Sequence, residues 1–300
     1  MRSSVIKITL VYLGMCLVWG STWVAIKTGL KSLTPLLSAG LRFTIAAIGI
    51  FIIMRMRGMA LQKDRHAVKL YLLMGIFSFV IPFGLVYWGE QFVPSGLASV
   101  LFGVYPFFVA IFSFFLLPDE KIGYFKVSGM ILGFIGIIVI FSDTFGTKMS
   151  LNVLGMLAIV LSGILQAGVA VVIKKEGKRL NPLTMNFFPM LLAGVGLIIL
   201  GILFEDLSYV KFDNYAVFSV LYLALFGSIY TFTSFYWLMK KVNVIILSLL
   251  AFITPIVALF LGWIIYNEQL TIENIIGAVM VLIGLLIANL QSIIKPKTLS

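Results

Sequence analysis

Uninterrupted apolar runs of about 20 residues recur along nearly the whole chain, and about 20 are needed for a helix to cross a bilayer core. Hydrophobic residues make up 61% of the sequence and charged residues only 11%, whereas a soluble domain is charged at about a quarter of its positions. The pattern therefore excludes a water-soluble globule. It also excludes a porin-like barrel, whose strands alternate in short segments.

The apolar runs predict an all-α integral membrane protein with ten transmembrane helices joined by short linkers. Their expected ranges are 8–27, 34–54, 70–90, 95–117, 123–142, 151–173, 183–204, 215–239, 243–266 and 272–291. The first run lacks a small-residue cleavage site at its end, so we expect it to be retained as a helix and not removed as a signal.

Basic residues are distributed unevenly between the two sets of loops. If the N-terminus is cytoplasmic, 17 of the 22 Lys and Arg residues fall in inner loops, four fall in outer loops, and Arg42 lies within the membrane. Because Lys and Arg collect in cytoplasmic loops, the count predicts a multi-pass protein of the cell (inner or plasma) membrane with both termini cytoplasmic. The same bias explains the net charge of +11, so we expect the lipid bilayer as a partner and no nucleic acid.

The two halves of the chain resemble each other at an offset of 147 to 149 residues. The matching pairs are Ile26-Lys27 with Ile173-Lys174, Leu33-Thr34-Pro35-Leu36 with Leu180-Asn181-Pro182-Leu183, Tyr87-Trp88 with Tyr236-Trp237, Ser99 with Ser248, Pro106 with Pro255, Glu120 with Glu268, Gly129 with Gly277, and Gly136 with Gly284. Each half holds five spans, an odd number, so the second half must enter the membrane upside down. The sequence thus predicts two inverted five-helix repeats, 1–145 and 146–300, a plan of secondary transporters whose substrate site lies near the midplane.

Several short motifs carry a family resemblance. They are Trp19-Gly20-Ser21-Thr22-Trp23, Leu41-Arg42-Phe43, Ser95-Gly96-Leu97-Ala98-Ser99 with Tyr105-Pro106, and Thr254-Pro255 with Asn267-Glu268. In this order, over roughly residues 8–290, they resemble the ten-helix EamA-type branch of the drug/metabolite transporter superfamily. The resemblance implies an EamA-like basket of helices around a central cavity, alternating access, and a small-molecule substrate. That family includes exporters of amino acids and other metabolites.

The second half departs from the first at two motif positions. Gln166-Ala167-Gly168 stands where the first half has Trp19-Gly20-Ser21, and Pro189 stands where it has Arg42. We therefore expect the two repeats to contribute different chemistry to the cavity.

Arg42 is the one charge that the expected spans bury deeply, about eight residues and so roughly 12 Å into its helix. A charge at that depth is costly and usually faces a cavity or a partner. Arg42 is a candidate for binding an anionic substrate group; alternatively, it snorkels outward or fixes helix packing by bonding carbonyls or Glu90. Glu90, at the expected outer end of its helix, is a candidate for proton coupling. It could equally be a solvated residue or the partner of Arg42.

Polar and aromatic residues of the spans are the other candidates for lining the cavity. They are Trp19, Ser21, Trp23, Tyr87, Trp88, Ser99, Tyr105, Gln166, Asn186, Tyr230, Thr233, Ser234, Trp237 and Thr254. Trp and Tyr could instead form interfacial belts. Four prolines within spans, Pro82, Pro106, Pro189 and Pro255, predict kinks, either static or freeing carbonyls for a cavity.

No catalytic or metal site is expected. Glu120 and Glu268 lie on opposite membrane faces by the repeat, and each is expected to stabilise the start of the helix that follows it. The chain has one cysteine, Cys16, and one histidine, His66, which leaves no metal-ligand cluster. We also find no phosphate-binding loop, so no cofactor is expected.

Small-residue faces predict close helix packing. Gly129 and Gly133 share one helix, and Gly277 and Gly284 share another. Such faces pack helices within a bundle or across a dimer seam, so a monomer and a homodimer are both compatible with the sequence.

The leading functional interpretation is a secondary transporter that exports a small polar metabolite, such as an amino acid. The first alternative is efflux of hydrophobic drug-like or cationic compounds, which is less favoured because no acid is expected deep in a span. The second is an integral-membrane enzyme acting on lipid substrates, which would require clustered catalytic groups that the sequence lacks.

Overall fold

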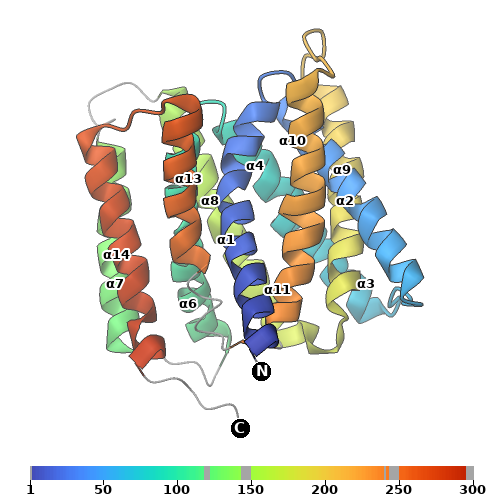
Figure 1. Cartoon of the computed structure of the whole chain (residues 1–300), viewed down its shortest axis with the longest axis horizontal. Helices are drawn as coiled ribbons and strands as arrows, with labels where there is room; N and C mark the ends of the chain where they lie inside the picture. Colours follow the sequence, from blue (N-terminus) through green and yellow to red (C-terminus); the bar gives the residue numbers. More distant parts are fainter. Residues whose placement is uncertain (1, 118–121, 143–149, 240, 243–249, 295–300) are drawn as a thin grey trace.

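The computed structural model of the chain describes residues 2–117, 122–142, 150–239, 241–242 and 250–294. Every regular element in these ranges is a helix (Figure 1). In chain order they are α1 (Arg2–Gly29), α2 (Pro35–Met56), α3 (Arg65–Met74), η1 (Gly75–Val80), α4 (Ile81–Gly89), α5 (Ser95–Phe102), α6 (Tyr105–Leu116), α7 (Tyr124–Ser142), α8 (Leu151–Glu176), η2 (Gly177–Arg179), α9 (Pro182–Phe204), α10 (Asn214–Ala224), η3 (Leu225–Tyr230), α11 (Thr231–Met239), α13 (Leu250–Tyr266) and α14 (Ile272–Ile294).

The expected all-helical membrane fold is confirmed. Within the described ranges, nine helical segments are long and apolar enough to cross a membrane, and Leu250–Tyr266 is a shorter apolar helix. The expected range 243–266 begins in residues 243–249, which lie outside the described part. The range 95–117 contains two helices instead of one, because α5 and α6 are separated at Gly103 and Val104.

Helix starts follow local sequence signals. Pro35 opens α2, where its missing N–H would have had no helical partner. Asp64 accepts a hydrogen bond from the Ala67 N–H at the start of α3, and Asp213 accepts one from the Ala216 N–H at the start of α10. These side chains satisfy backbone donors that a helix N-terminus leaves unpaired, and so they fix where two spans begin.

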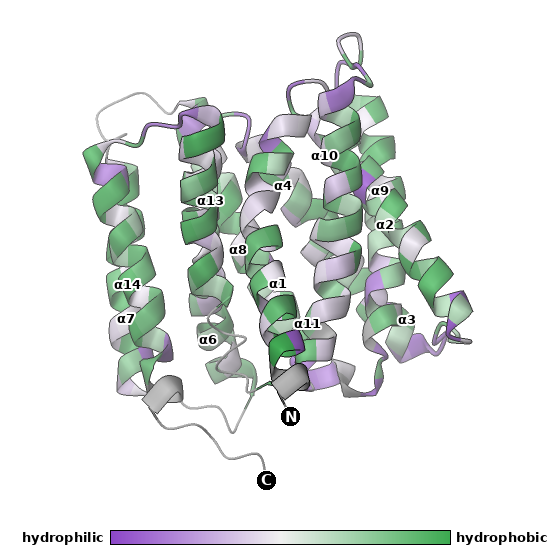
Figure 2. Cartoon of the chain, viewed as in Figure 1, coloured by the Kyte–Doolittle hydropathy of each residue, from purple (hydrophilic) through white to green (hydrophobic). Residues whose placement is uncertain are grey.

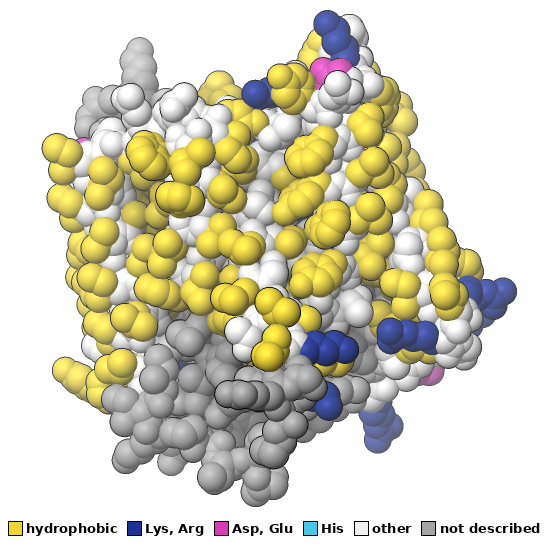
Figure 3. Space-filling model, in the orientation of Figure 1, with side chains coloured by type: hydrophobic (Ala, Val, Ile, Leu, Met, Phe, Trp, Pro, Cys, Tyr) yellow, Lys and Arg dark blue, Asp and Glu magenta, His cyan; other side chains and the backbone are white. Residues whose placement is uncertain are grey.

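The surface is apolar around the middle of the bundle and polar at its two ends (Figure 2). Large apolar side chains such as Phe218, Phe260 and Trp263 are more than half exposed, and Figure 3 shows hydrophobic side chains spread over the middle and upper parts of one face. An apolar surface of this extent would be a liability in water but suits contact with lipid. In Figure 1, α1 begins and α14 ends at the lower face, which also carries the loop 57–64.

Two helix pairs form the closest contacts in the bundle, α7 with α14 and α2 with α9. A Cβ added at Gly136 would lie 2.7 Å from the Gly277 carbonyl oxygen, and one at Gly40 would lie 2.8 Å from the Ile198 nitrogen. Only glycine allows backbones to approach so closely. The glycine faces expected from the sequence therefore pack α7 against α14 within one chain.

The helix contacts also occur in equivalent pairs, in which each span is replaced by its counterpart from the other half. The third span (α3–η1–α4) packs on α8, and its counterpart, the eighth (α10–η3–α11), packs on α1. Likewise α6, in the fourth span, packs on α8, while α13, in the ninth, packs on α1. An inverted repeat predicts these paired contacts, because a two-fold axis in the membrane plane exchanges the first span with the sixth and the fourth with the ninth.

Two π-helical segments interrupt the spans at corresponding places in the two halves. η1 (Gly75–Val80) lies between α3 and α4, and η3 (Leu225–Tyr230) lies between α10 and α11. A π-segment widens the helix by one residue and occurs frequently at functional sites. No sequence pattern predicts π-helical geometry at either place, although the kink expected at Pro82 lies next to η1.

Candidate functional site

Arg42 lies in a buried polar centre formed by α2, α4 and η3. Arg42 is only 3% exposed. The Nε atom donates to Ser228 Oγ at 3.2 Å, and the two terminal nitrogens donate to the Tyr87 hydroxyl and the Gly227 carbonyl, each at 3.4 Å. Of the two earlier alternatives to substrate binding, outward snorkelling is thus wrong and bonding to a carbonyl is observed.

The guanidinium of Arg42 is held loosely. Hydrogen bonds of 3.4 Å are at the weak end of the usual range, and the described residues occupy three of the five N–H donors that an arginine carries. The rings of Phe43 and Phe83 lie 5.0 and 5.1 Å from the guanidinium carbon. A carboxylate could form shorter, charge-assisted hydrogen bonds with this group, so the centre is suited to an anionic ligand.

Neighbouring residues of the first and eighth spans complete this centre. Ser228 Oγ donates to the Leu223 carbonyl, and Thr231 Oγ1 donates to Gly227 O. A side chain added at Gly227 would meet the methyl group of Thr22 at 2.9 Å. The π-segment η3 thus brings a carbonyl and a hydroxyl to the arginine. Ser228 is a contact that the sequence analysis missed, although the polar residues in 227–234 were a signal for it.

Glu90 follows directly after α4 and is 1% exposed. Both of its carboxylate oxygens lack a hydrogen-bond partner among the described residues. It is therefore not a solvated interfacial residue, and that alternative is wrong. No hydrogen bond joins it to Arg42, although the two residues lie close enough for their charges to interact.

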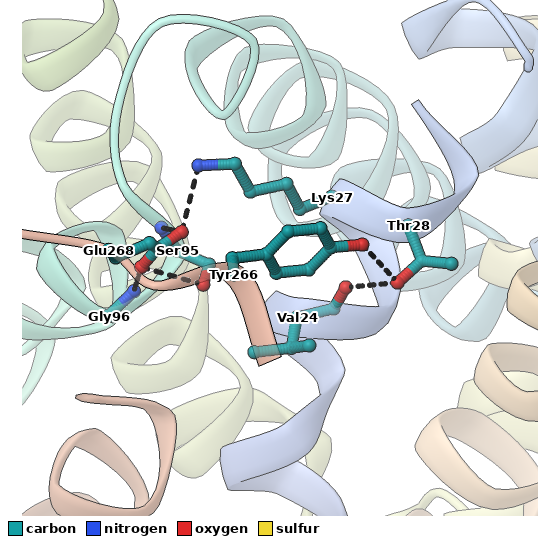
Figure 4. Close-up of polar contacts among 7 residues, drawn as sticks. All are labelled: Val24, Lys27, Thr28, Ser95, Gly96, Tyr266 and Glu268. Carbon is teal, nitrogen blue, oxygen red and sulfur yellow. Dashed lines mark hydrogen bonds and ion pairs between the residues drawn. The ribbon is translucent and has the colours of Figure 1, made fainter. Parts of the chain in front are cut away.

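A second polar cluster ties together the upper face of the bundle as drawn in Figure 1. Lys27 Nζ lies 2.8 Å from Glu268 Oε1, and the Ser95 and Gly96 backbone N–H groups at the start of α5 donate to the same carboxylate (Figure 4). We call Lys27, Ser95, Gly96 and Glu268 the upper clasp. It joins α1, α5 and the loop between α13 and α14 in one charge-assisted network.

Glu268 corrects a detail of the sequence analysis. Its carboxylate stabilises the N-terminus of α5, not that of the helix that follows it in the chain. Thr271 instead accepts a hydrogen bond from Asn274 at the start of α14. Burial by itself raises the pKa of Glu268, but the hydrogen bonds from Lys27, Ser95 and Gly96 outweigh it, and the net pKa is lowered. Glu120 lies outside the described residues.

Other carboxylates bind the two halves together on the same face. Glu205 accepts hydrogen bonds from the backbone N–H groups of Leu36 and Leu37 at the start of α2. Ser32 donates to Asp213 at 2.7 Å. The upper face is thus bridged between the repeats at several points, which is the arrangement expected of a closed entrance.

The aromatic candidates divide into two groups of contacts. Trp23 packs on both large apolar cores and lies 5.6 Å from the ring of Phe102, which stacks on Tyr105. Trp19 contacts Phe232 and Phe235. Trp23 is half-buried between the two cores, so it has the more central position of the two tryptophans.

Several of the remaining cavity candidates make contacts in other parts of the bundle. Trp88 packs on Phe92 in the α4–α5 connection, and Trp237 lies beneath Lys7 near the lower face. Tyr230 donates to the Val11 carbonyl, and the Thr254 carbonyl faces Gly20 across the α1–α13 contact. Ser99, Asn186 and Ser234 are buried, whereas Gln166 and Thr233 are half-buried.

Ser21 borders a separate apolar groove between α1, α10 and α13. The groove has a volume of about 360 Å³ and includes Leu17, Tyr222 and Phe260 in its walls. Ser21 Oγ and Tyr222 Oη are 2.6 Å apart. Leu17 and Phe260 are more than half exposed, so the groove opens toward the lipid-facing surface and not toward Arg42.

The four prolines have different local settings. Pro82 lies in the first turn of α4, directly after the π-segment η1, and Pro106 lies in the first turn of α6, after the break at Gly103–Val104. Pro189 and Pro255 lie inside α9 and α13. Thus the first-half prolines coincide with interruptions of regular helix, whereas the second-half prolines do not.

A bundle of apolar, membrane-length helices around a buried charged centre is the architecture of a multi-pass membrane transporter. The model of the EamA-like transporter family matches residues 6–142 and again residues 153–290, so the chain belongs to this family and contains two copies of its repeat.

Relatives with similar sequences span nearly the same length. The chain is 31% identical to "Uncharacterized transporter YoaV" of Bacillus subtilis (strain 168) over 281 residues, covering 93% of this chain and 96% of that protein. It is 27% identical to "Protein PagO" of Salmonella typhimurium over 280 residues, covering 93% and 92%. A solved crystal structure matches with a TM-score of 0.68 at 20% identity, covering 95% of this chain and 98% of that one, and shows the shared fold.

Proposed function

We propose that this chain exports small polar metabolites that carry a carboxylate, amino acids and related compounds being the leading class, by alternating access. In this proposal the protein resides in the cell membrane with both termini cytoplasmic, so the upper face of Figure 1 is the outer face. The binding chamber is centred on Arg42 and is bordered by Tyr87, Ser228 and the first-span residues Thr22 and Trp23.

The observation that carries the proposal is the loosely held, buried guanidinium of Arg42. A charge buried in a membrane protein usually serves a substrate or an ion. The described residues provide Arg42 with neutral oxygen partners only. An anionic substrate group would compensate the buried positive charge, which a hydrophobic cation could not do.

The arrangement of the two halves supports alternating access. The halves exchange equivalent contacts, and each carries a π-segment at a corresponding place, of which η3 contributes Gly227 and Ser228 to the centre. The upper face is bridged by the upper clasp and by Glu205, so opening it would require a limited set of polar contacts to break. Rocking of one repeat against the other is how inverted-repeat transporters expose a central site alternately.

The test begins with the substrate. Metabolites are compared inside and outside cells with and without the chain, and compounds that shift outward are assayed by counterflow in proteoliposomes. A carrier preloaded with unlabelled compound should accelerate entry of the labelled compound, and a channel should not. If no carboxylate-bearing compound shifts in cells and none shows counterflow, the proposed substrate class is wrong.

The apolar groove beside Ser21 favours a second candidate function, efflux of hydrophobic compounds that enter from the lipid. Its walls are almost entirely apolar and its rim is exposed. In that case hydrophobic compounds should show counterflow, and Val257→Trp, which fills the groove, should abolish it without affecting carboxylate transport.

A further inference from the structure

Glu90 is a buried carboxylate that the proposed substrate site does not use. Among the described residues, it is the one carboxylate whose two oxygens are buried and lack any hydrogen-bond partner. Placing an ionised carboxylate in such a site without compensation costs several kcal/mol, whereas the protonated acid is tolerated. The geometry therefore calls for a ligand that neutralises Glu90.

The charged and titratable groups around Glu90 come from four elements. They are Lys27 of α1, Arg42 of α2, Tyr87 of α4, and Glu268 of the loop between α13 and α14. The remaining side is covered by α8, where Gly89 packs against Gly155 and Ile159, which cannot titrate.

Neither nearby cation is hydrogen-bonded to Glu90. Lys27 Nζ is 2.8 Å from Glu268, and the Arg42 guanidinium donates to Ser228, Tyr87 and Gly227. Lys27 thus has two carboxylates within its electrostatic reach but is bonded to only one of them.

We propose that Glu90 is a proton-binding site linked to the upper clasp through Lys27, which serves the two carboxylates alternately. While Lys27 is held by Glu268, Glu90 carries a proton. When the clasp opens, Lys27 is free to pair with Glu90, and the proton is released. Because linkage is reciprocal, protonation of Glu90 favours the closed upper face to the same extent that closure favours protonation.

A proton suits this site better than a metal cation. Mg²⁺ and Ca²⁺ require about six or more oxygen ligands, and the site offers one carboxylate flanked by two positively charged side chains. A proton needs a single carboxylate oxygen. We therefore expect acidic medium to favour the closed upper face, as long as the pH stays high enough for Glu268 to remain ionised.

The first test titrates the carboxyl group directly. Infrared difference spectra of the purified chain in lipid nanodiscs, acidic minus alkaline, should contain a protonated-carboxyl band. The band should disappear in Glu90→Gln and persist in Asp206→Asn, which changes an exposed acid of the same face. If Glu90→Gln retains the full band, Glu90 does not bind the proton.

The second test follows the clasp. Ser99 is 3% exposed and lies one turn below Ser95 on α5, so Ser99→Cys in a Cys16→Ala background should react with a maleimide only when the upper face opens. Labelling rates are divided by those of Asp206→Cys, an exposed site, because thiol reactivity itself rises with pH. We expect relative labelling to rise at least about tenfold, or ~1.4 kcal/mol, from acidic to alkaline buffer.

Two variants test whether the pH dependence of labelling comes from Glu90 and from the upper clasp. Glu90→Gln, which mimics the protonated acid, should remain slow to label at every pH, and Glu268→Gln should label fast at every pH. An unchanged pH response in Glu90→Gln would overturn the linkage, even if the infrared band is assigned to Glu90. Neither test requires a substrate, so failure here and failure of the proposed transport activity can be told apart.

Discussion

At the scale of single residues, the burial of a charge matters less than how completely its neighbours satisfy it. Arg42 and Glu268 both lie in the protein interior, but Glu268 receives a lysine, a hydroxyl and two backbone N–H groups, with the closest at 2.8 Å. Arg42 has only neutral partners at 3.2 to 3.4 Å. A fully bonded charge stabilises one conformation, whereas a loosely bonded one is available for a ligand.

Two substitutions of Arg42 should distinguish the effect of its positive charge from the effect of its guanidinium geometry. Arg42→Ala should weaken the apparent affinity for a carboxylate-bearing substrate by about 10- to 100-fold, because a hydrogen bond to a charged group contributes about 1.5–3 kcal/mol. Arg42→Lys keeps the charge and should retain part of the activity. The measurement is counterflow in proteoliposomes, with expression and melting temperature as controls. Normal transport by both folded variants would remove Arg42 from the substrate site.

Glu268→Gln tests the upper clasp through stability. The pKa of Glu268 is lowered in the folded protein, so its ionised form contributes stability that is present above the ordinary pKa of 4.5 and is lost as the pH falls below it. Near neutral pH the free energy of unfolding of the variant should therefore be lower than that of the parent by on the order of 2 kcal/mol, which is measured as a lower melting temperature. The difference should shrink in acid.

The matched control for this prediction is Glu273→Gln, an exposed acid in the first turn of α14. It should leave the melting temperature nearly unchanged, since surface charges contribute little. A difference between parent and Glu268→Gln that is constant with pH would contradict the assigned role of the ionised carboxylate.

At the scale of elements, close helix crossings hold the bundle together. In water such contacts would be supported by the hydrophobic effect, but helices in lipid gain mainly from tight packing of small residues. The pair α7 and α14 illustrates this, because Gly136 faces the backbone of Gly277 directly. The two helices of the pair occupy equivalent places in the two repeats, and the crossing pairs each glycine with the copy of the other one: Gly136 meets Gly277, and Gly129 meets Gly284.

A glycine-to-alanine substitution, which adds one methyl group, should distinguish a glycine at a close helix crossing from one with space around it. Gly136→Ala would place Cβ 2.7 Å from a carbonyl oxygen, whereas Gly196→Ala would meet only the Val80 side chain at 3.8 Å. We expect Gly136→Ala to destabilise the protein by about 1–3 kcal/mol. Gly196→Ala should be neutral or slightly stabilising. Thermal unfolding in detergent measures both, and equal melting temperatures would argue against the crossing.

The elements differed in how far the sequence could predict them. Apolar length and basic loops fixed the helices and the expected orientation because both depend on composition over about 20 residues. The π-segments η1 and η3 and the break at Gly103–Val104 depend on tertiary packing and left no such pattern. The depth of Arg42 was predictable because it follows from the position of the residue within its apolar run. Its contact with Ser228, and the contact between Lys27 and Glu268 across 241 residues, depend on how the helices pack and were not predictable.

At the scale of the whole molecule, a symmetric scaffold carries an asymmetric site. The two copies of the family repeat, 6–142 and 153–290, exchange equivalent contacts. The arginine, however, occurs only in the first copy, where α2 has Arg42 and the corresponding place in α9 has Pro189. In the proposed transporter, the symmetry of the repeats would provide two related conformations, and the asymmetric site would hold the substrate in a single orientation.

The expected inversion of the two repeats leads to a prediction about equivalent loops. The connection between the second and third spans contains Lys63, and its counterpart between the seventh and eighth contains Asp206. If the repeats are inverted and both termini are cytoplasmic, Lys63→Cys should be protected from a membrane-impermeant maleimide added to intact cells, and Asp206→Cys should react. Each is made in a Cys16→Ala background, and permeabilised cells provide the measure of full reactivity.

A second equivalent pair should behave in the opposite order, with Lys31→Cys reactive and Arg179→Cys protected. Parallel repeats would place both members of each pair on the same side, and in that case a single chamber opened alternately by rocking of the two halves would have no structural basis.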